Sequence, residues 1–198
     1  MDELAEKAGK DPFEFRLMHL EDERARAVLE KLRSIAGATA ERGASGSPHR
    51  AIGIAFSRCE NTKSYCAVAA RRVARETAAG KTTFPRVQKM WAVIDAGEVI
   101  NLYGIKNTIE GGLVQSASWT LYEEVKFNEY QITSLNWNSY PIIRFPQSPE
   151  VEVVVLDRPN EKAVGAGEAA QGPAAAAIVN AIYHATGKRV RHLPVARA

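Results

Sequence analysis

Apolar side chains recur at helical spacing through the first part of the chain, which predicts a helical lead-in. The first helix is expected over residues 2–20. The stretch 9–12 interrupts it, because Asp11 can cap a second helical piece and Pro12 suits the first position of that piece. A further helix is expected over residues 22–36, ending near a glycine.

Beyond a small, polar segment at 37–49, which is expected to be a loop, the pattern changes to short apolar runs typical of strands. Two longer segments keep helical spacing, at 107–122 and 172–186. In the first, adjacent glycines reduce helix stability and would allow another backbone to come close. In the second, Pro173 fits the first turn and Gly187 can end the helix. The expected strands are 52–56, 65–73, 84–94 and 151–156, with a strand pair over 125–135.

The strands do not alternate strictly with helices, so the fold class is predicted to be α+β, with a mixed sheet and packed helices. A chain of 198 residues can form one domain with a proper core. We therefore expect a single domain over 1–198, with a helical lead-in at 1–36, a loop at 37–49 and an α+β body at 50–198.

Composition and charge exclude several classes of protein. Hydrophobic residues make up 45% and charged residues 25%, as in ordinary globular proteins. The net charge is 26 − 23 = +3, and no basic run is interleaved with aromatics, so no nucleic-acid partner is expected. No apolar stretch approaches about 18 residues, so no membrane span is expected. The acidic start lacks the apolar core of a signal peptide, and the compartment stays open between cytoplasm and periplasm.

The two cysteines indicate neither a disulfide nor a metal site. Cys59 and Cys66 lie seven positions apart, which matches no zinc or iron–sulfur pattern. On a strand, an odd separation places two side chains on opposite faces, so these two are not expected to pair. No residue of the chain is predicted to ligate a metal.

The segment most suited to chemistry is 163–173, between the last expected strand and an alanine-rich helix. Glu168 is its one carboxylate, with Gly165 and Gly167 just before it. Glycines let backbone lie against a ligand. Small apolar neighbours would disfavour the charged form of a carboxylate, which suits it to proton transfer.

Two other interpretations of this segment stay open. Glu168 can be a carboxylate that simply favours a helix N-terminus, and local features alone favour this interpretation. The glycines can also belong to a dinucleotide-binding turn, which needs a strand leading directly into them. The residues at 157–160 end the strand too early for such a turn.

Gly165 to Pro173, followed by Ala-Ala-Ala-Ala-Ile-Val-Asn-Ala-Ile, resembles the C-terminal signature of the xanthine dehydrogenase/aldehyde oxidase superfamily. The closest likeness is to large subunits of the isoquinoline 1-oxidoreductase and nicotinate dehydrogenase type. Further segments resemble the second molybdopterin-binding domain of these subunits in the family's order, so that the likeness covers nearly the whole chain: 2–17, 93–101, 109–115 and 140–153.

This resemblance implies a molybdenum–pterin cofactor, of the molybdopterin cytosine dinucleotide form, bound jointly with a complementary molybdopterin-binding domain or chain. The family hydroxylates a carbon of an N-heterocycle or an aldehyde with oxygen from water, and passes electrons to iron–sulfur clusters on a 2Fe–2S subunit. Glu168 stands at the position of the family's general base. The backbone at Val164, Gly165, Ala166 and Gly167 is implied to lie close to the cofactor.

The chain departs from the family pattern at two positions and in length. Thr108 stands where the family has a glutamine whose amide reaches the cofactor, and a hydroxyl is shorter with one donor only. Leu102 replaces a common proline. Family large subunits are several times longer than this chain. These departures support an alternative, a cofactor-free remnant or interaction module of the same fold, whereas the intact segment around Glu168 opposes it.

Overall fold

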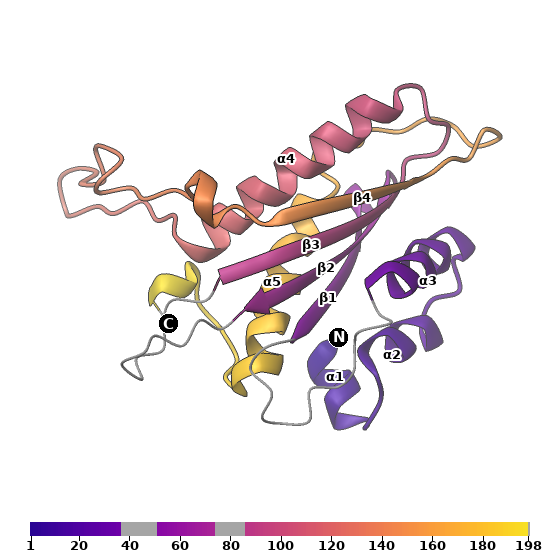
Figure 1. The fold of residues 1–198 in the computed structure, drawn as a ribbon, viewed down its shortest axis with the longest axis horizontal. Helices are drawn as coiled ribbons and strands as arrows, with labels where there is room; N and C mark the ends of the chain where they lie inside the picture. The colour runs from indigo at the N-terminus through magenta and orange to yellow at the C-terminus, as the bar shows by residue number, and fades with distance from the viewer. Residues whose placement is uncertain (37–50, 74–85, 198) are drawn as a thin grey trace.

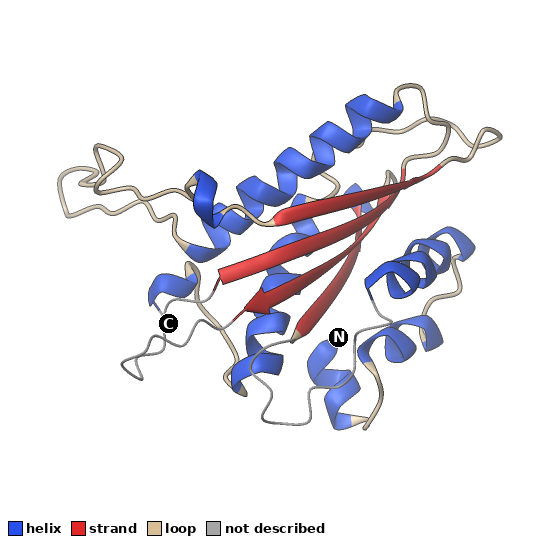
Figure 2. Cartoon of the chain, viewed as in Figure 1, coloured by secondary structure: helices blue, strands red, loops and turns tan. Residues whose placement is uncertain are grey.

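The protein is described by a computed structural model that covers residues 1–36, 51–73 and 86–197. Four strands form one mixed sheet in the order β1-β2-β3-β4, shown in Figure 1 and, by element type, in Figure 2. The first three strands run antiparallel to their neighbours, and β3 and β4 are parallel. The predicted α+β class with a mixed sheet is therefore confirmed. The strands are β1 (Ile52–Arg58), β2 (Tyr65–Val73), β3 (Arg86–Asp95) and β4 (Glu150–Leu156).

Helices cover both faces of this sheet. Alternate strand residues point to opposite faces, so Val68 and Ala92 pack in the core beneath α4 and α5, whereas Ala67 and Val93 pack against α3. None of the helices in the described ranges is long and apolar enough to cross a membrane. The helices are α1 (Asp2–Lys7), α2 (Pro12–Met18), α3 (Glu23–Ala36), α4 (Leu102–Leu121) and α5 (Gln171–Thr186), with short 3₁₀ turns at Cys59–Asn61, Phe145–Gln147 and Val195–Arg197.

Side chains satisfy the outer edge of β1. The carbonyl of Ile54 accepts hydrogen bonds from Asn180 at 3.1 Å and from Arg16 at 3.3 Å. The Nδ1 atom of His184 lies 2.7 Å from the carbonyl oxygen of Ile52. An edge strand with unpaired backbone groups invites pairing with another chain. The contacts from α2 and α5 block that pairing and hold both helices beside the sheet.

Three helices end or begin where the sequence predicts. Asp11 Oδ1 accepts hydrogen bonds from the backbone of Phe13 and Glu14, and caps α2 as expected. Gly187 ends α5 in the left-handed conformation, with φ +70°. The predicted helix at 22–36 is α3. The predicted loop at 37–49 lies outside the described residues.

The start of α4 corrects the prediction, because the helix begins at Leu102 rather than at residue 107. Asn101 caps it, since its Oδ1 accepts a hydrogen bond from Gly104 N at 2.8 Å. Leu102 occupies the first helical position, where proline is also favoured. Its departure from the family pattern is therefore compatible with the same helix.

The predicted strand pair at 125–135 is wrong. A single bridge joins Phe127 to Ile132, and Asn128 Oδ1 accepts the amides of Tyr130 and Gln131 in a turn. An isolated two-stranded hairpin is marginal in water unless a third strand or a helix packs on it. Residues 122–149, which we call the arm, instead project from the body of the protein in Figure 1.

The cysteines are free, as predicted, but their placement differs from the expectation. Cys59 lies in a 3₁₀ turn after β1, and Cys66 is buried in β2. Burial raises the pKa of the Cys66 thiol to about 12, so it behaves as a small apolar side chain.

Candidate cofactor site

The loop that joins β4 to α5 carries the Glu168 segment, and backbone contacts hold it at one end of the sheet. Val164 N donates to the carbonyl of Ala96, just beyond β3, at 2.9 Å. Ser64, fully buried at the start of β2, donates its hydroxyl to the carbonyl of Gly165 at 2.8 Å. These bonds, from residues about 70 and 100 positions away, fix the backbone before Glu168.

A glycine allows the turn after β3 to touch this loop. Gly97 has φ +77°, and a Cβ atom there would lie 2.1 Å from the carbonyl oxygen of Lys162. Arg158 N donates to the carbonyl of Gly97 at 3.1 Å. A side chain at position 97 would therefore displace the loop as well as strain the backbone.

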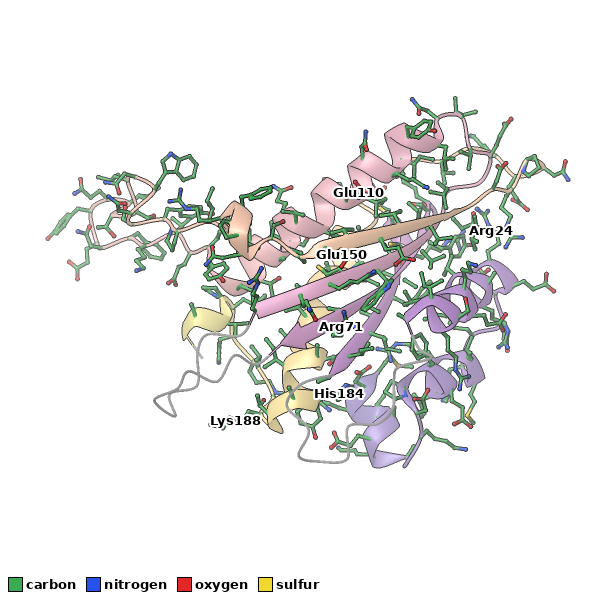
Figure 3. All side chains as sticks on the ribbon, in the orientation of Figure 1. Arg24, Arg71, Glu110, Glu150, His184 and Lys188 are labelled. Atoms are coloured by element: carbon green, nitrogen blue, oxygen red, sulfur yellow. The ribbon has the colours of Figure 1, made fainter. Side chains whose placement is uncertain are left out.

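A buried charge cluster lies beneath the same contact. Asp95 is 0% exposed and forms ion pairs with Arg24 of α3 at 2.5 Å and with Arg158 of the loop at 3.1 Å. Figure 3 labels Arg24. Burial by itself would raise the pKa of Asp95, but hydrogen bonds from Arg24, Gly97 N and Arg158 outweigh it and hold that pKa below its ordinary value.

Glu168 itself is exposed, two residues before the cap position of α5. Within the described part of the chain its carboxylate has no hydrogen-bond or ion-pair partner. Lys63 is close enough to interact with its charge, although the raised pKa of Lys63 comes mainly from a hydrogen bond with Glu60. The expected apolar surroundings are therefore not supplied by this chain. Water exclusion around Glu168 needs a further surface.

Neither alternative interpretation of the segment gains a contact. Ala170 precedes α5, and no side chain caps this helix end, so no hydrogen bond supports a purely capping role for Glu168. The dinucleotide turn requires a strand running into the glycines. Here residues 157–164 separate β4 from Gly165.

Three glycines around the site have empty space where a side chain would be. A Cβ atom on Gly111, Gly165 or Gly167 would meet nothing within 4 Å, and none of the three has a positive φ. No neighbour within the described chain therefore requires glycine at these positions. Such open glycines suit the close approach of a bound group, so the backbone present here fits a large cofactor.

Helix α4 brings a neighbouring glycine beside the start of α5. A Cβ atom on Gly112 would lie 3.7 Å from Gln171 Cγ and 3.9 Å from Ala170 Cβ, which is ordinary contact between side chains. The close backbone approach expected at 111–112 is thus not found. Thr108, one turn before Gly112 on the same side of the helix, is exposed.

A separate groove of about 710 Å³ lies along α4, against the base of the arm. Glu110, labelled in Figure 3, Val114 and Gln115 line it from the helix, and Ile142 and Ile143 line it from the arm. Neither Glu168 nor Thr108 lines this groove, so it is distinct from the site that the sequence predicts.

The match to a family model defines the class of protein. Residues 10–149 match the model of the molybdopterin cofactor-binding domain, and the chain belongs to that family. The matched range includes Thr108 and Gly111 but ends before Glu168.

Curated and solved relatives agree with this class. The chain is 38% identical over 98% of its length to a nicotinate dehydrogenase polypeptide of Pseudomonas putida, and spans 17% of that protein. It is 26% identical, also over 98% of its length, to the beta subunit of isoquinoline 1-oxidoreductase from Brevundimonas diminuta, and spans 24% of it. Quinoline 2-oxidoreductase from Pseudomonas putida 86 superposes with a TM-score of 0.58 and 26% identity, over 67% of this chain and 17% of that one.

Sequence reasoning located Glu168 and its glycines but missed the residues that hold them. Asp95 and Gly97 fall inside the segment 93–101 that resembles the family, yet nothing local indicates that they contact the loop. Ser64 carries no signal at all, because its partner is 101 positions away.

Proposed function

We propose that residues 1–198 form one molybdopterin-binding domain of a molybdenum hydroxylase, with Glu168 as its general base. The observation that carries the proposal is the pairing of an unpartnered, exposed carboxylate with open glycines on a loop whose backbone is fixed at both ends. The names of the relatives support an N-heterocycle as substrate, with an aldehyde as the other class.

The residues of the chain would divide the work as follows. Backbone from Val164 to Gly167 would lie against the cofactor, and the Thr108 hydroxyl would donate one hydrogen bond to it. The bound molybdenum–pterin group, proposed to be molybdopterin cytosine dinucleotide, supplies the oxidation of an electron-poor carbon. The Glu168 carboxylate accepts the proton that is released as oxygen from water becomes bonded to that carbon.

The surroundings of Glu168 require a partner surface. The chain spans 17% and 24% of the first two curated relatives, so most of a relative's polypeptide lies outside the matched region. We propose that a complementary molybdopterin-binding domain or chain covers the site, and that a 2Fe–2S subunit takes the electrons. Exclusion of water by the complementary domain would then disfavour charge on Glu168 and assist proton transfer.

Elemental and pterin analysis tests the proposal directly. The chain purified with its complementary polypeptide should hold about one molybdenum and one pterin per chain, whereas the chain alone should hold neither, since half a groove leaves the cofactor uncovered. A loaded isolated chain would refute the shared groove. A complete complex without molybdenum would favour the cofactor-free alternative.

Gly111→Ala should stabilise the chain and yet reduce cofactor loading. An alanine inside a helix is favoured over glycine by up to about 1 kcal/mol, and nothing lies within 4 Å of the new methyl group. Denaturant unfolding of the chain should show this gain in the free energy of unfolding. Molybdenum content of the complex should fall, because the methyl group occupies the cofactor's space.

The matched control is Ser34→Ala on α3, at an exposed helical position on the other face of the sheet. It should also raise stability slightly and leave molybdenum content unchanged. If Gly111→Ala loads as well as the parent, the open glycine on α4 does not face the cofactor.

The isolated chain should self-associate through the arm. Phe127, Tyr130, Trp137 and Phe145 are between 64% and 95% exposed, and a large exposed apolar patch marks an interaction surface. Light scattering should report masses above the 21.7 kDa of one chain. The double change Phe127→Ser, Trp137→Ser should reduce association, whereas Met18→Ser on α2 should not. A parent chain that stays monomeric over a wide concentration range contradicts this expectation.

A further inference from the structure

We infer that Asp95 is a positioning residue for Glu168, although the two lie 73 positions apart in the sequence. This inference rests on the proposed role of Glu168 and adds the group that holds its loop in place. Asp95 ends β3 and touches neither the open glycines nor Glu168. Its action passes through Arg158 and the turn at 96–97, which contact the loop directly.

The Asp95 carboxylate is saturated with donors. Its Oδ1 accepts from Arg24 Nη2 at 2.5 Å and from Gly97 N at 3.0 Å, and its Oδ2 accepts from Arg24 Nε at 3.2 Å and Arg158 Nε at 3.1 Å. Only an ionised carboxylate offers two acceptor oxygens with no donor. An amide at this position would turn its NH₂ group toward a guanidinium or a backbone N–H.

The donors come from three separate parts of the fold. Arg24 belongs to α3, where its guanidinium also lies 4.9 Å from the Tyr65 ring and 3.3 Å from Glu161. Gly97 belongs to the turn after β3. Arg158 and Glu161 belong to the loop after β4. Asp95 is thus the point at which the lead-in helix, the sheet and the Glu168 loop are joined.

Backbone bonds carry this constraint toward Glu168. Arg158 N donates to Gly97 O, and Glu98 N donates to Glu161 O at 3.0 Å, so the turn and the loop pair along their length. The last bond of the series joins Val164 N to Ala96 O, four residues before Glu168. Displacement of the turn at 96–97 therefore shifts the backbone from which Glu168 projects.

Loss of the carboxylate should move the loop rather than the helix. Without it, the guanidinium groups of Arg24 and Arg158 face one another with no anion between them, which costs free energy in a buried site. Arg24 is retained by Tyr65 and Glu161, and its side chain is 22% exposed. Arg158 lies on the loop with its side chain 37% exposed, and it can turn into solvent.

Hydrogen–deuterium exchange of the 198-residue chain tests the inference. In Asp95→Asn, the Val164 amide should lose roughly tenfold or more of its protection, as expected when charged hydrogen bonds that hold a contact are removed. Amides of the sheet core, such as that of Val68, should lose protection only as far as global stability falls.

Asp2→Asn is the matched control, because Asp2 is also buried and pairs with Arg16 at 2.5 Å, remote from the loop. It should lower protection of Val164 and Val68 together. Arg158→Gln, at a half-exposed position, repeats the test should Asp95→Asn fail to fold, and it should loosen Val164 selectively. Unchanged protection of Val164 in the Asp95 or Arg158 variant, or equal loss in the Asp2 control, overturns the inference.

Kinetics of the loaded complex then separate the two proposals. Asp95→Asn should lower kcat with little change in KM or molybdenum content, because the base is misplaced while the groove remains. If the loop loosens and kcat is unchanged, Glu168→Gln decides the cause. An inactive Glu168→Gln means that Asp95 does not position the base, whereas an active one means that Glu168 is not the base.

Discussion

Replacing Glu168 with glutamine is expected to reduce turnover of the loaded complex by about 10²–10⁴-fold, the usual cost of losing a general base. Glutamine has nearly the same shape and still accepts a hydrogen bond, so the loop need not move. It does not take up a proton at neutral pH. The measurement is the steady-state rate at matched molybdenum content, which should equal that of the parent.

Glu98→Gln is a suitable control, since Glu98 is an exposed carboxylate at the same end of the sheet and uses its backbone amide for contact with the loop. It should keep full turnover. If Glu168 only favours the helix end, its change to glutamine should cost roughly 0.3–1 kcal/mol of stability and leave the rate within a few-fold of the parent. That result would remove Glu168 from the chemistry.

Gly53→Ala should be the most destabilising of the single changes considered, by about 3 kcal/mol or more, because overpacking at an unyielding contact exceeds the usual range. A Cβ atom on Gly53 would lie 2.1 Å from Ala181 N and 2.2 Å from Ala177 O. Both are backbone atoms of α5, so no side-chain rotation relieves the clash. The helix must move off β1, and the Glu168 loop moves with its N-terminus.

Denaturant unfolding measures this effect, with Gly112→Ala as the control. The nearest atoms to a Cβ on Gly112 are 3.7 Å away, so that change should be neutral or stabilising. A Gly53→Ala chain as stable as the parent would mean that α5 does not pack on β1 at this distance. The same variant should load less molybdenum, since α5 follows directly from the cofactor loop.

Helix boundaries were predictable where the deciding contacts are local. The Asp11 cap and the left-handed Gly187 involve residues within four positions, and such contacts can be inferred from residue types. The Asn101 cap of α4 is equally local, although the expected helix started five residues too late to include it. The arm is the opposite case. Its apolar residues alternate as in a strand, but Phe127 and Ile132 form only one bridge because nothing in the described chain covers them.

The amino-acid sequence by itself determined the α+β class, the lead-in helices and the motif that contains Glu168, because caps, periodicity and motif are properties of neighbouring residues. Only the tertiary structure decided how that motif is held. Asp95 meets Arg24 and Arg158 across 71 and 63 positions, and Ser64 meets Gly165 across 101. Contacts of such separation depend on how the strands pair and the helices pack, and residue type alone does not specify them.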